Sequence, residues 1–183
     1  MRPITVTQSA AGASPWQPLD YLQRPFDVSL FASLSEDASG ITYTVEYTPD
    51  NPNPRRKERN NVASLSRTTT VATLTLTNNH NLVTGDSVTV TNSGNANLDG
   101  TYPVASTPTA KSLTYTVANT GATVGGPYAE AILMRVFPQG NLAGLTVRAS
   151  GFFSSPCMAV RINNTAWTAG SSILEILQGH ARG

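Results

Sequence analysis

Short runs of alternating large and polar residues recur along the chain, and this period of two is typical of β-strands with one buried face. The clearest runs lie at residues 26–34 and 41–48, with Ser39-Gly40 as a turn between them. We predict that these two runs form a β-hairpin. Further strands are predicted at residues 71–77, 86–91, 101–105, 112–118, 129–137, 145–149, 158–162 and 172–177.

No segment sustains the 3.6-residue period of an amphipathic helix beyond two turns. The pattern therefore predicts an all-β fold. The middle of the chain is saturated with Thr and Asn, whereas the flanks hold more Phe, Trp, Pro and Arg. We expect residues 67–129 to be a small module, either an antiparallel β-barrel or an Ig-like domain. We expect residues 1–66 and 130–183 to form an outer, jelly-roll-like β-sandwich, because insertions are best tolerated at surface loops. Two sequential domains are the alternative, but the last 54 residues would then need a core of their own.

The composition excludes several classes of partner and site. Only 13% of the residues are charged and the net charge is +1, so no overall field attracts nucleic acid or an anionic membrane. The apolar run at residues 131–134 is far shorter than the roughly 20 residues that span a bilayer. A single cysteine, Cys157, allows no internal disulfide and no cysteine-based zinc cluster.

No catalytic or cofactor pattern stands out. The two histidines, His80 and His180, are far apart in the chain, and no Gly-x-Ser-x-Gly elbow is present. We interpret His80 as a structural or merely exposed residue and Cys157 as a small buried hydrophobe. Scattered carboxylates leave room for a glycosidase pair or for a calcium site at Asp86 and Asp99, but no known spacing supports either. We expect no enzyme activity, no cofactor and no metal.

Two features suggest contact with a partner. Arg55, Arg56, Lys57 and Arg59 place four positive charges within five residues, and Arg forms bidentate contacts with carboxylates. This cluster is either a solvated loop or an arm that docks on an acidic neighbour. Residues 1–18 are expected to be an extended N-terminal arm, with Trp16 as its anchor on a neighbouring subunit.

The middle module carries the pattern H-N-L-x-x-G-D-x-V-x-V at residues 80–90, L-D-G-T-Y-x-V at 98–104 and L-x-Y-T-V at 113–117. This pattern resembles a module common in tailed-bacteriophage virion proteins. The flanks are similar to small phage structural proteins at PLDYLQRPF (18–26), YTVEYT (43–48), AVRINNTA (159–166) and LQG (177–179). The pattern also has a local physical basis, because Asn81 and Gly85 tolerate the positive φ of tight turns. We expect Asp86 to accept hydrogen bonds from backbone donors, and Leu98 and Tyr102 to fill the ends of the small core.

The resemblance implies a non-enzymatic structural protein of a tailed-phage particle. The specific expectation is a capsid decoration (cement) protein that contacts the major capsid protein or other virion proteins, made in the bacterial cytoplasm and located in the virion. A homo-oligomer, for example a trimer, suits this role. The alternative is a tail, neck or fibre adaptor or adhesin that contacts host surface glycans. Neither a membrane nor a specific nucleic acid is expected as a partner.

Overall fold

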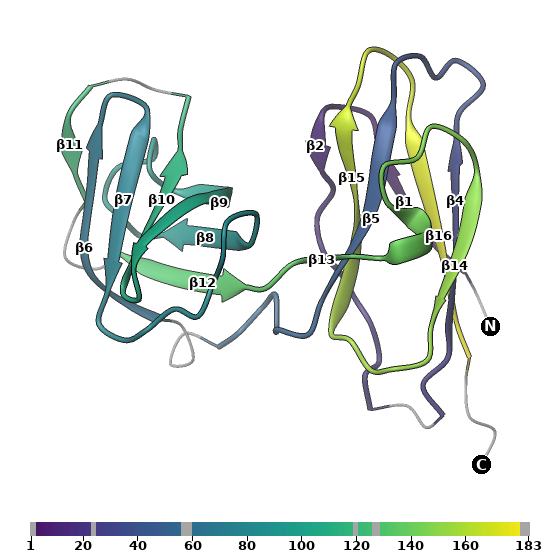
Figure 1. The fold of residues 1–183 in the computed structure, drawn as a ribbon, viewed down its shortest axis with the longest axis horizontal. Helices are drawn as coiled ribbons and strands as arrows, with labels where there is room; N and C mark the ends of the chain where they lie inside the picture. The colour runs from purple at the N-terminus through teal and green to yellow at the C-terminus, as the bar shows by residue number, and fades with distance from the viewer. Residues whose placement is uncertain (1–2, 23–24, 56–59, 119–120, 126–128, 180–183) are drawn as a thin grey trace. The chain divides into compact units, whose positions relative to one another are not determined.

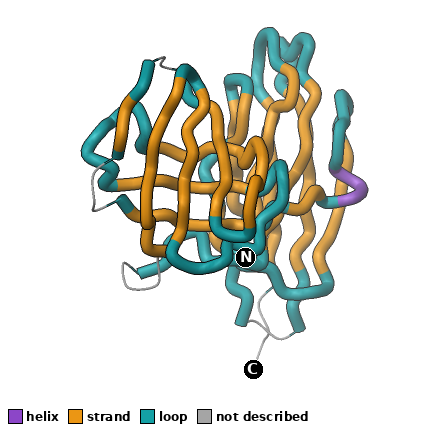
Figure 2. The backbone as a smooth tube through the Cα atoms, turned by 60° about the vertical axis from the view of Figure 1, so that its left-hand side comes forward, coloured by secondary structure: helices purple, strands orange, loops and turns teal. Residues whose placement is uncertain are grey.

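The structure is a computed structural model that describes residues 3–22, 25–55, 60–118, 121–125 and 129–179. The chain divides into two compact units. The outer unit comprises Met1–Asn51 and Phe137–Gly183, and the barrel unit comprises Pro52–Val136. In the described part of the chain the regular structure consists of strands and one 3-10 turn, Gly140–Leu142, so the fold is all-β (Figure 2).

The outer unit contains two antiparallel sheets (Figure 1). Its strands are β1 (Ile4–Gln8), β2 (Gly12–Ala13), β3 (Gln17–Pro18), β4 (Val28–Leu34), β5 (Thr42–Thr48), β13 (Phe137–Pro138), β14 (Ala149–Phe153), β15 (Ala159–Ala166) and β16 (Ser172–Gln178). One sheet has the order β1-β16-β4-β14. The other has the order β13-β5-β15-β2, and β3 also pairs with β15.

Both sheets bury one face in a single hydrophobic core. Alternate residues of β4 and β16 supply one side of this core, and alternate residues of β5 and β15 supply the other. The shared core includes Val28, Leu30, Ala32, Tyr43, Val45, Val160, Ile162, Leu174 and Ile176. The opposite faces of the same strands therefore point away from this core.

The predicted hairpin of residues 26–34 and 41–48 is wrong. β4 pairs with β14 and β16, whereas β5 lies in the other sheet and pairs with β13 and β15. The residues between the strands cross from one sheet to the other. Alternation correctly identified which residues are buried, but it carries no information about which strand lies alongside.

The barrel unit is a closed antiparallel barrel. Its strands are β6 (Asn60–Thr68), β7 (Val71–Leu76), β8 (Ser87–Thr91), β9 (Gly100–Thr109), β10 (Ser112–Thr116), β11 (Thr123–Val124) and β12 (Glu130–Met134). The order β6-β12-β8-β9-β10-β7 closes because β7 pairs with β6, and β11 adds to β6. Of the two architectures expected for the module, the structure has the barrel. Its core includes Leu65, Leu74, Val88, Leu98, Val104, Leu113 and Tyr115.

The unit boundaries lie outside the expected range of 67–129. β6 pairs with β7 and β11, and β12 pairs with β6 and β8, so both flanking strands belong to the barrel. The strand expected at 145–149 is also displaced. Leu145 makes only an isolated bridge to Tyr43, and the strand β14 begins at Ala149.

Candidate interaction surfaces

Trp16 packs against its own chain. It immediately precedes β3, which pairs with β15, and the Arg161 guanidinium carbon on β15 lies 4.2 Å from the centroid of its ring. A cation at this distance is attracted by the negative face of the indole. The indole Nε1 is buried without a hydrogen-bond partner among the described residues. The side chain as a whole is only half-buried, so contact with a partner stays a prediction.

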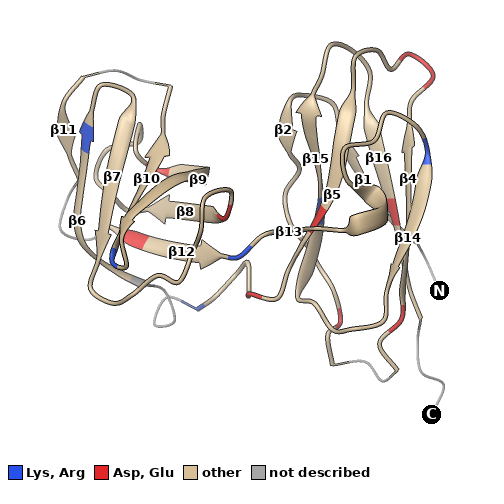
Figure 3. Cartoon of the chain, in the orientation of Figure 1, with Lys and Arg blue, Asp and Glu red and all other residues tan. Residues whose placement is uncertain are grey.

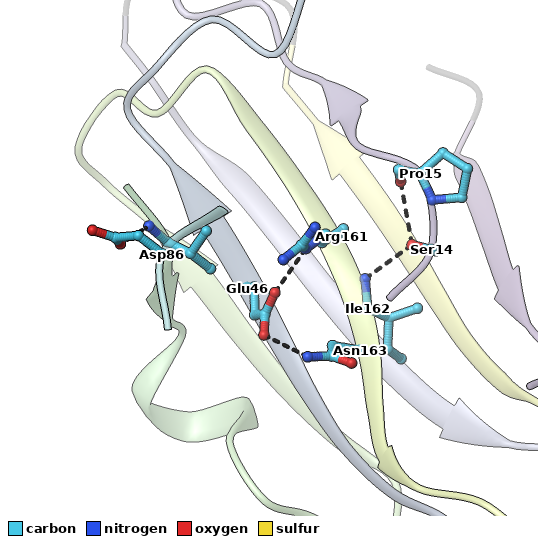
Figure 4. Close-up of polar contacts among 8 residues, drawn as sticks. Ser14, Pro15, Glu46, Asp86, Arg161, Ile162 and Asn163 are labelled. Carbon is cyan, nitrogen blue, oxygen red and sulfur yellow. Dashed lines mark hydrogen bonds and ion pairs between the residues drawn. The ribbon is translucent and has the colours of Figure 1, made fainter. Parts of the chain in front are cut away.

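The register of β5 and β15 explains why Arg161 is held in place. Arg161 is the Cα partner of Glu46 across the two strands. Its Nε donates to Glu46 Oε2 at 2.7 Å, and Asn163 Nδ2 donates to Glu46 Oε1 at 2.7 Å (Figure 4). One carboxylate therefore fixes two neighbouring side chains of β15. This arrangement can orient the cation beneath Trp16, and both carboxylate oxygens of Glu46 are engaged in it.

The N-terminal segment is part of the outer unit's own sheets. β1 pairs with β16, and β2 and β3 pair with β15. Ser14 donates its backbone N–H to the Ile162 carbonyl at 2.8 Å, and its Oγ accepts the Ile162 N–H at 3.2 Å (Figure 4). Asn164 Nδ2 donates to the carbonyls of Gln8 and Ala10. The expectation of an arm lying across a neighbour is therefore corrected for the described residues from position 3 onward.

The basic cluster is only partly described. Arg55 is exposed and lies in the segment that leads to β6. Arg56, Lys57 and Arg59 lie outside the described residues. The structure therefore neither brings this cluster together nor separates it, and docking on an acidic neighbour stays a prediction.

The residues of the module's sequence pattern serve the fold. Asn81 and Gly85 adopt φ values of 53° and 95°, as expected. Asp86 is buried and accepts two backbone hydrogen bonds at 2.8 Å, from Val83 N–H to Oδ2 and from Val136 N–H to Oδ1. The expected role of Asp86 is confirmed. Its carboxylate joins the entrance of β8 to the exit of β12.

Two aromatic side chains pack together in the core of the barrel. Tyr102 and Tyr115 stack with ring centroids 4.6 Å apart, and Leu98 is fully buried. Tyr115 donates its hydroxyl to the Leu98 carbonyl, and Tyr102 donates to the Asp99 carbonyl. Burial raises the pKa of both tyrosines, and the nearby Asp99 charge adds to the shift. Both rings act as core residues.

The two residues most often used in catalysis have structural environments here. His80 is buried, its Nδ1 accepts the Leu82 N–H at 3.0 Å, and its Nε2 faces the Thr109 carbonyl at 3.0 Å. Since Nδ1 accepts, Nε2 carries the proton. Burial raises the pKa of the Cys157 thiol to about 12, which keeps it protonated and unreactive. Among the described residues, no three His, Cys, Asp or Glu side chains cluster as metal ligands, and no helix is long and apolar enough to cross a membrane.

Exposed aromatic residues gather on the outer surface of the sheet β1-β16-β4-β14, which the sequence analysis did not identify. Because Val28, Leu30 and Ala32 point into the core, Phe31 must point away from it, and the same alternation turns Phe152 outward from β14. Phe31 is 47% exposed and Phe152 is 62% exposed. We call the outward residues of β4, β14 and β16 the aromatic face: Ser29, Phe31, Ser33, Ser150, Phe152, Ile173, Glu175 and Leu177.

An uncharged surface covers four strands of the barrel. The outward residues form two rows of hydroxyl groups, Ser64-Thr75-Ser112-Thr109 and Ser66-Thr73-Thr114-Ser106. Hydroxyl pairs within the rows bond at 2.7 Å (Ser106 and Thr114) and 2.9 Å (Thr109 and Ser112). Strands of both units carry few charged side chains (Figure 3). The rows on the barrel present hydroxyl groups and no charge, and the aromatic face carries one charged side chain, Glu175.

Comparisons with protein-family models, with curated proteins and with solved structures found no match.

Proposed function

We propose that this chain is a non-enzymatic structural protein of a tailed-phage particle, and specifically a capsid decoration protein. In this role it would hold neighbouring capsid subunits together through many weak contacts. The observation that carries the proposal is the strand pairing of the outer unit. The sequence pattern of the barrel and the low charge of the described surfaces add to it.

The strand pairing favours a jelly roll. Counting β2 and β3 together as one strand, the outer unit has eight strands. The first strand pairs with the eighth (β1 with β16), the second with the seventh (β2 with β15), the third with the sixth (β4 with β14) and the fourth with the fifth (β5 with β13). The eighth strand, β16, also pairs with the third, β4, and the seventh, β15, also pairs with the fourth, β5. These pairings join the eight strands into two four-stranded sheets. This is the order expected when one long antiparallel ribbon wraps around a core. Jelly rolls are a recurrent architecture of viral capsid proteins and lectins.

The barrel is inserted at the tip of this ribbon. It lies in the chain between β5 and β13, the fourth and fifth strands, which pair with each other through Tyr47 and Phe137. A module at the tip interrupts no pairing within the ribbon. Its sequence pattern resembles a module of tailed-phage virion proteins, and this resemblance directs the proposal to a phage particle rather than to a lectin.

The hydroxyl rows of the barrel and the aromatic face, which together carry one charged side chain, fit a protein that binds to a lattice. Hydroxyl rows and scattered aromatic residues bury little charge on contact, so the desolvation cost is low. A single small contact is weak, but several copies of one contact on a repeating lattice raise the overall avidity by orders of magnitude.

Imaging of reconstituted particles tests this proposal. Purified full-length protein is added to empty phage heads that lack decoration, and the particles are examined by electron cryomicroscopy. Saturable density repeated over the capsid lattice is the expected result. Density at a single vertex or on the tail would instead favour the adaptor or adhesin, and an absence of bound density would refute the decoration role.

A further inference from the structure

The aromatic face has a regular pattern of apolar and polar residues. In the register of the sheet, Leu177, Ser29 and Phe152 form one row across β16, β4 and β14. The next row is Glu175, Phe31 and Ser150. Each apolar side chain therefore has a polar neighbour both along its strand and across to the next strand. Glu175 is the only charged residue of the face, and no hydrogen bond or ion pair joins it to another described residue.

In these two rows the pattern is complementary to itself. A two-fold axis lying in the plane of the face and running along β4 reverses the order of the strands but keeps each row in place. It would set β16 of one copy against β14 of the other. Leu177 then meets Phe152, and Phe31 meets its own equivalent on the axis. Glu175 meets the Ser150 hydroxyl, which can donate a hydrogen bond to the carboxylate.

We propose that two copies of this chain associate face to face through the aromatic face, about a two-fold axis along β4. Isologous contacts of this kind are the commonest form of protein self-association. A different partner would have to supply an apolar surface with a donor opposite Glu175, whereas a second copy supplies both at the required positions. The inference concerns the outer unit alone and does not depend on the role in a phage particle.

The size of the face indicates a weak dimer. The three strands of the face, spaced about 4.8 Å apart and about seven residues long at 3.3 Å each, cover roughly 330 Å². Standard stable interfaces bury about 800 Å² per partner. We therefore expect a monomer–dimer equilibrium that depends strongly on concentration, rather than an obligate dimer.

Sedimentation equilibrium of the full-length protein tests the pairing. The average mass is expected to rise from 19.3 kDa towards twice that value as the concentration approaches roughly 1 mM. Phe31→Lys places two charges together on the axis and should keep the protein monomeric. Val124→Lys, an equally drastic change at an exposed residue of the barrel unit, is the matched control and should dimerise like the wild type. Circular dichroism establishes that both variants are folded.

Two changes at Ser150 test the orientation of the axis. Ser150→Arg places a guanidinium opposite Glu175 at two symmetric positions and should tighten the dimer about two- to thirty-fold. Ser150→Glu should weaken it by a similar factor. The gain from Ser150→Arg should disappear in the Glu175→Gln background. A wild type that stays monomeric, a dimer that Phe31→Lys leaves intact, or no response to the charge at residue 150 would each overturn the proposal.

Discussion

Removal of the whole barrel unit, Pro52–Val136, is expected to leave a folded outer unit. Tyr47 and Phe137 are Cα partners in β5 and β13, so the two ends of the insertion already lie one strand spacing apart. Joining Asn51 directly to Phe137 leaves a hairpin loop of about four residues, from Thr48 to Asn51, which is a common loop length between antiparallel strands. The deletion therefore requires no rearrangement of either sheet.

The energetic effect of the shorter connection can be estimated from the same pairings. In the full chain, Asn61 and Glu130 pair across β6 and β12, so the folded barrel closes most of the insertion by itself. Outside the paired strands β6 and β12, the connection between Tyr47 and Phe137 is about fourteen residues long, and reducing it to about four lowers the loop-closure cost by about 1 kcal/mol. The outer unit of about 100 residues should unfold with an enthalpy near 70 kcal/mol and a free energy of about 5–15 kcal/mol.

Differential scanning calorimetry measures this enthalpy directly, and agreement with the van't Hoff value establishes a two-state transition. A shorter deletion of residues 67–129 is the control. It keeps β12 and β6 up to Ser66 but removes β7, which pairs with β6, and β8, which pairs with β12, and leaves apolar strand edges exposed. This protein should aggregate or unfold without cooperativity. If the longer deletion shows no cooperative transition, or the shorter one unfolds as sharply, the division into units described above is refuted.

Three further predictions concern single residues. Asp86→Ala removes the acceptor of the Val83 and Val136 amides and should lower the free energy of unfolding of the barrel, measured in urea, by about 2–4 kcal/mol. Asp86→Asn keeps one acceptor and should cause a smaller loss. Equal losses for the two variants would contradict the double contact. Gly170→Ala should cost roughly 2–4 kcal/mol, because φ is +79° and the new Cβ would lie 2.5 Å from Ala38 Cα; a neutral effect would contradict this geometry. Cys157 should resist thiol reagents until the protein unfolds. Because burial raises the pKa of its thiol to about 12 from the ordinary 9.0, its contribution to stability is complete below pH 9 and declines as the pH rises from 9 towards 12, by up to about 1.4 kcal/mol per pH unit. Cys157→Ala should flatten this part of the alkaline unfolding curve, and an unchanged curve would exclude the thiol as its source.

The fold class and most strand positions were predictable because each depends on local pattern. Val28, Leu30 and Ala32 alternate with Ser29, Phe31 and Ser33, of which only Phe31 is apolar, and this local pattern identifies a strand with one buried face. Strand partners were not predictable. β1 pairs with a strand at the other end of the chain, and the short strands β2, β3 and β13 have too few residues to show any period. The N-terminal segment was therefore misinterpreted as a free arm.

The turn residues of the barrel were also predictable, because Asn81, Gly85 and Asp86 act within a few residues of their own positions. The surroundings of Trp16 depend on register. Nothing local to residues 16, 46 or 161 indicates that Arg161 lies beneath the indole or opposite Glu46. The aromatic face could be predicted from the sequence only in part. Phe31 lies between Ser29 and Ser33 in the set of alternate positions that is otherwise polar, and this local pattern indicates that its ring points outward. Which residues of β14 and β16 lie beside it depends on the register.

The pairing of β1 with β16 has a consequence for synthesis on the ribosome. Ile4 and Ile176 are Cα partners, so the first strand has no neighbour until the last one has been made. The barrel, by contrast, has all of its pairing partners between Asn60 and Met134 and can close much earlier. Because domains fold as units when their residues emerge, the barrel should form first. The N-terminal strands should remain unpaired until β15 and β16 have been synthesised. Long-range pairing also makes the outer unit the slower of the two to fold, and its exposed strands are the part of the nascent chain that most needs protection from aggregation.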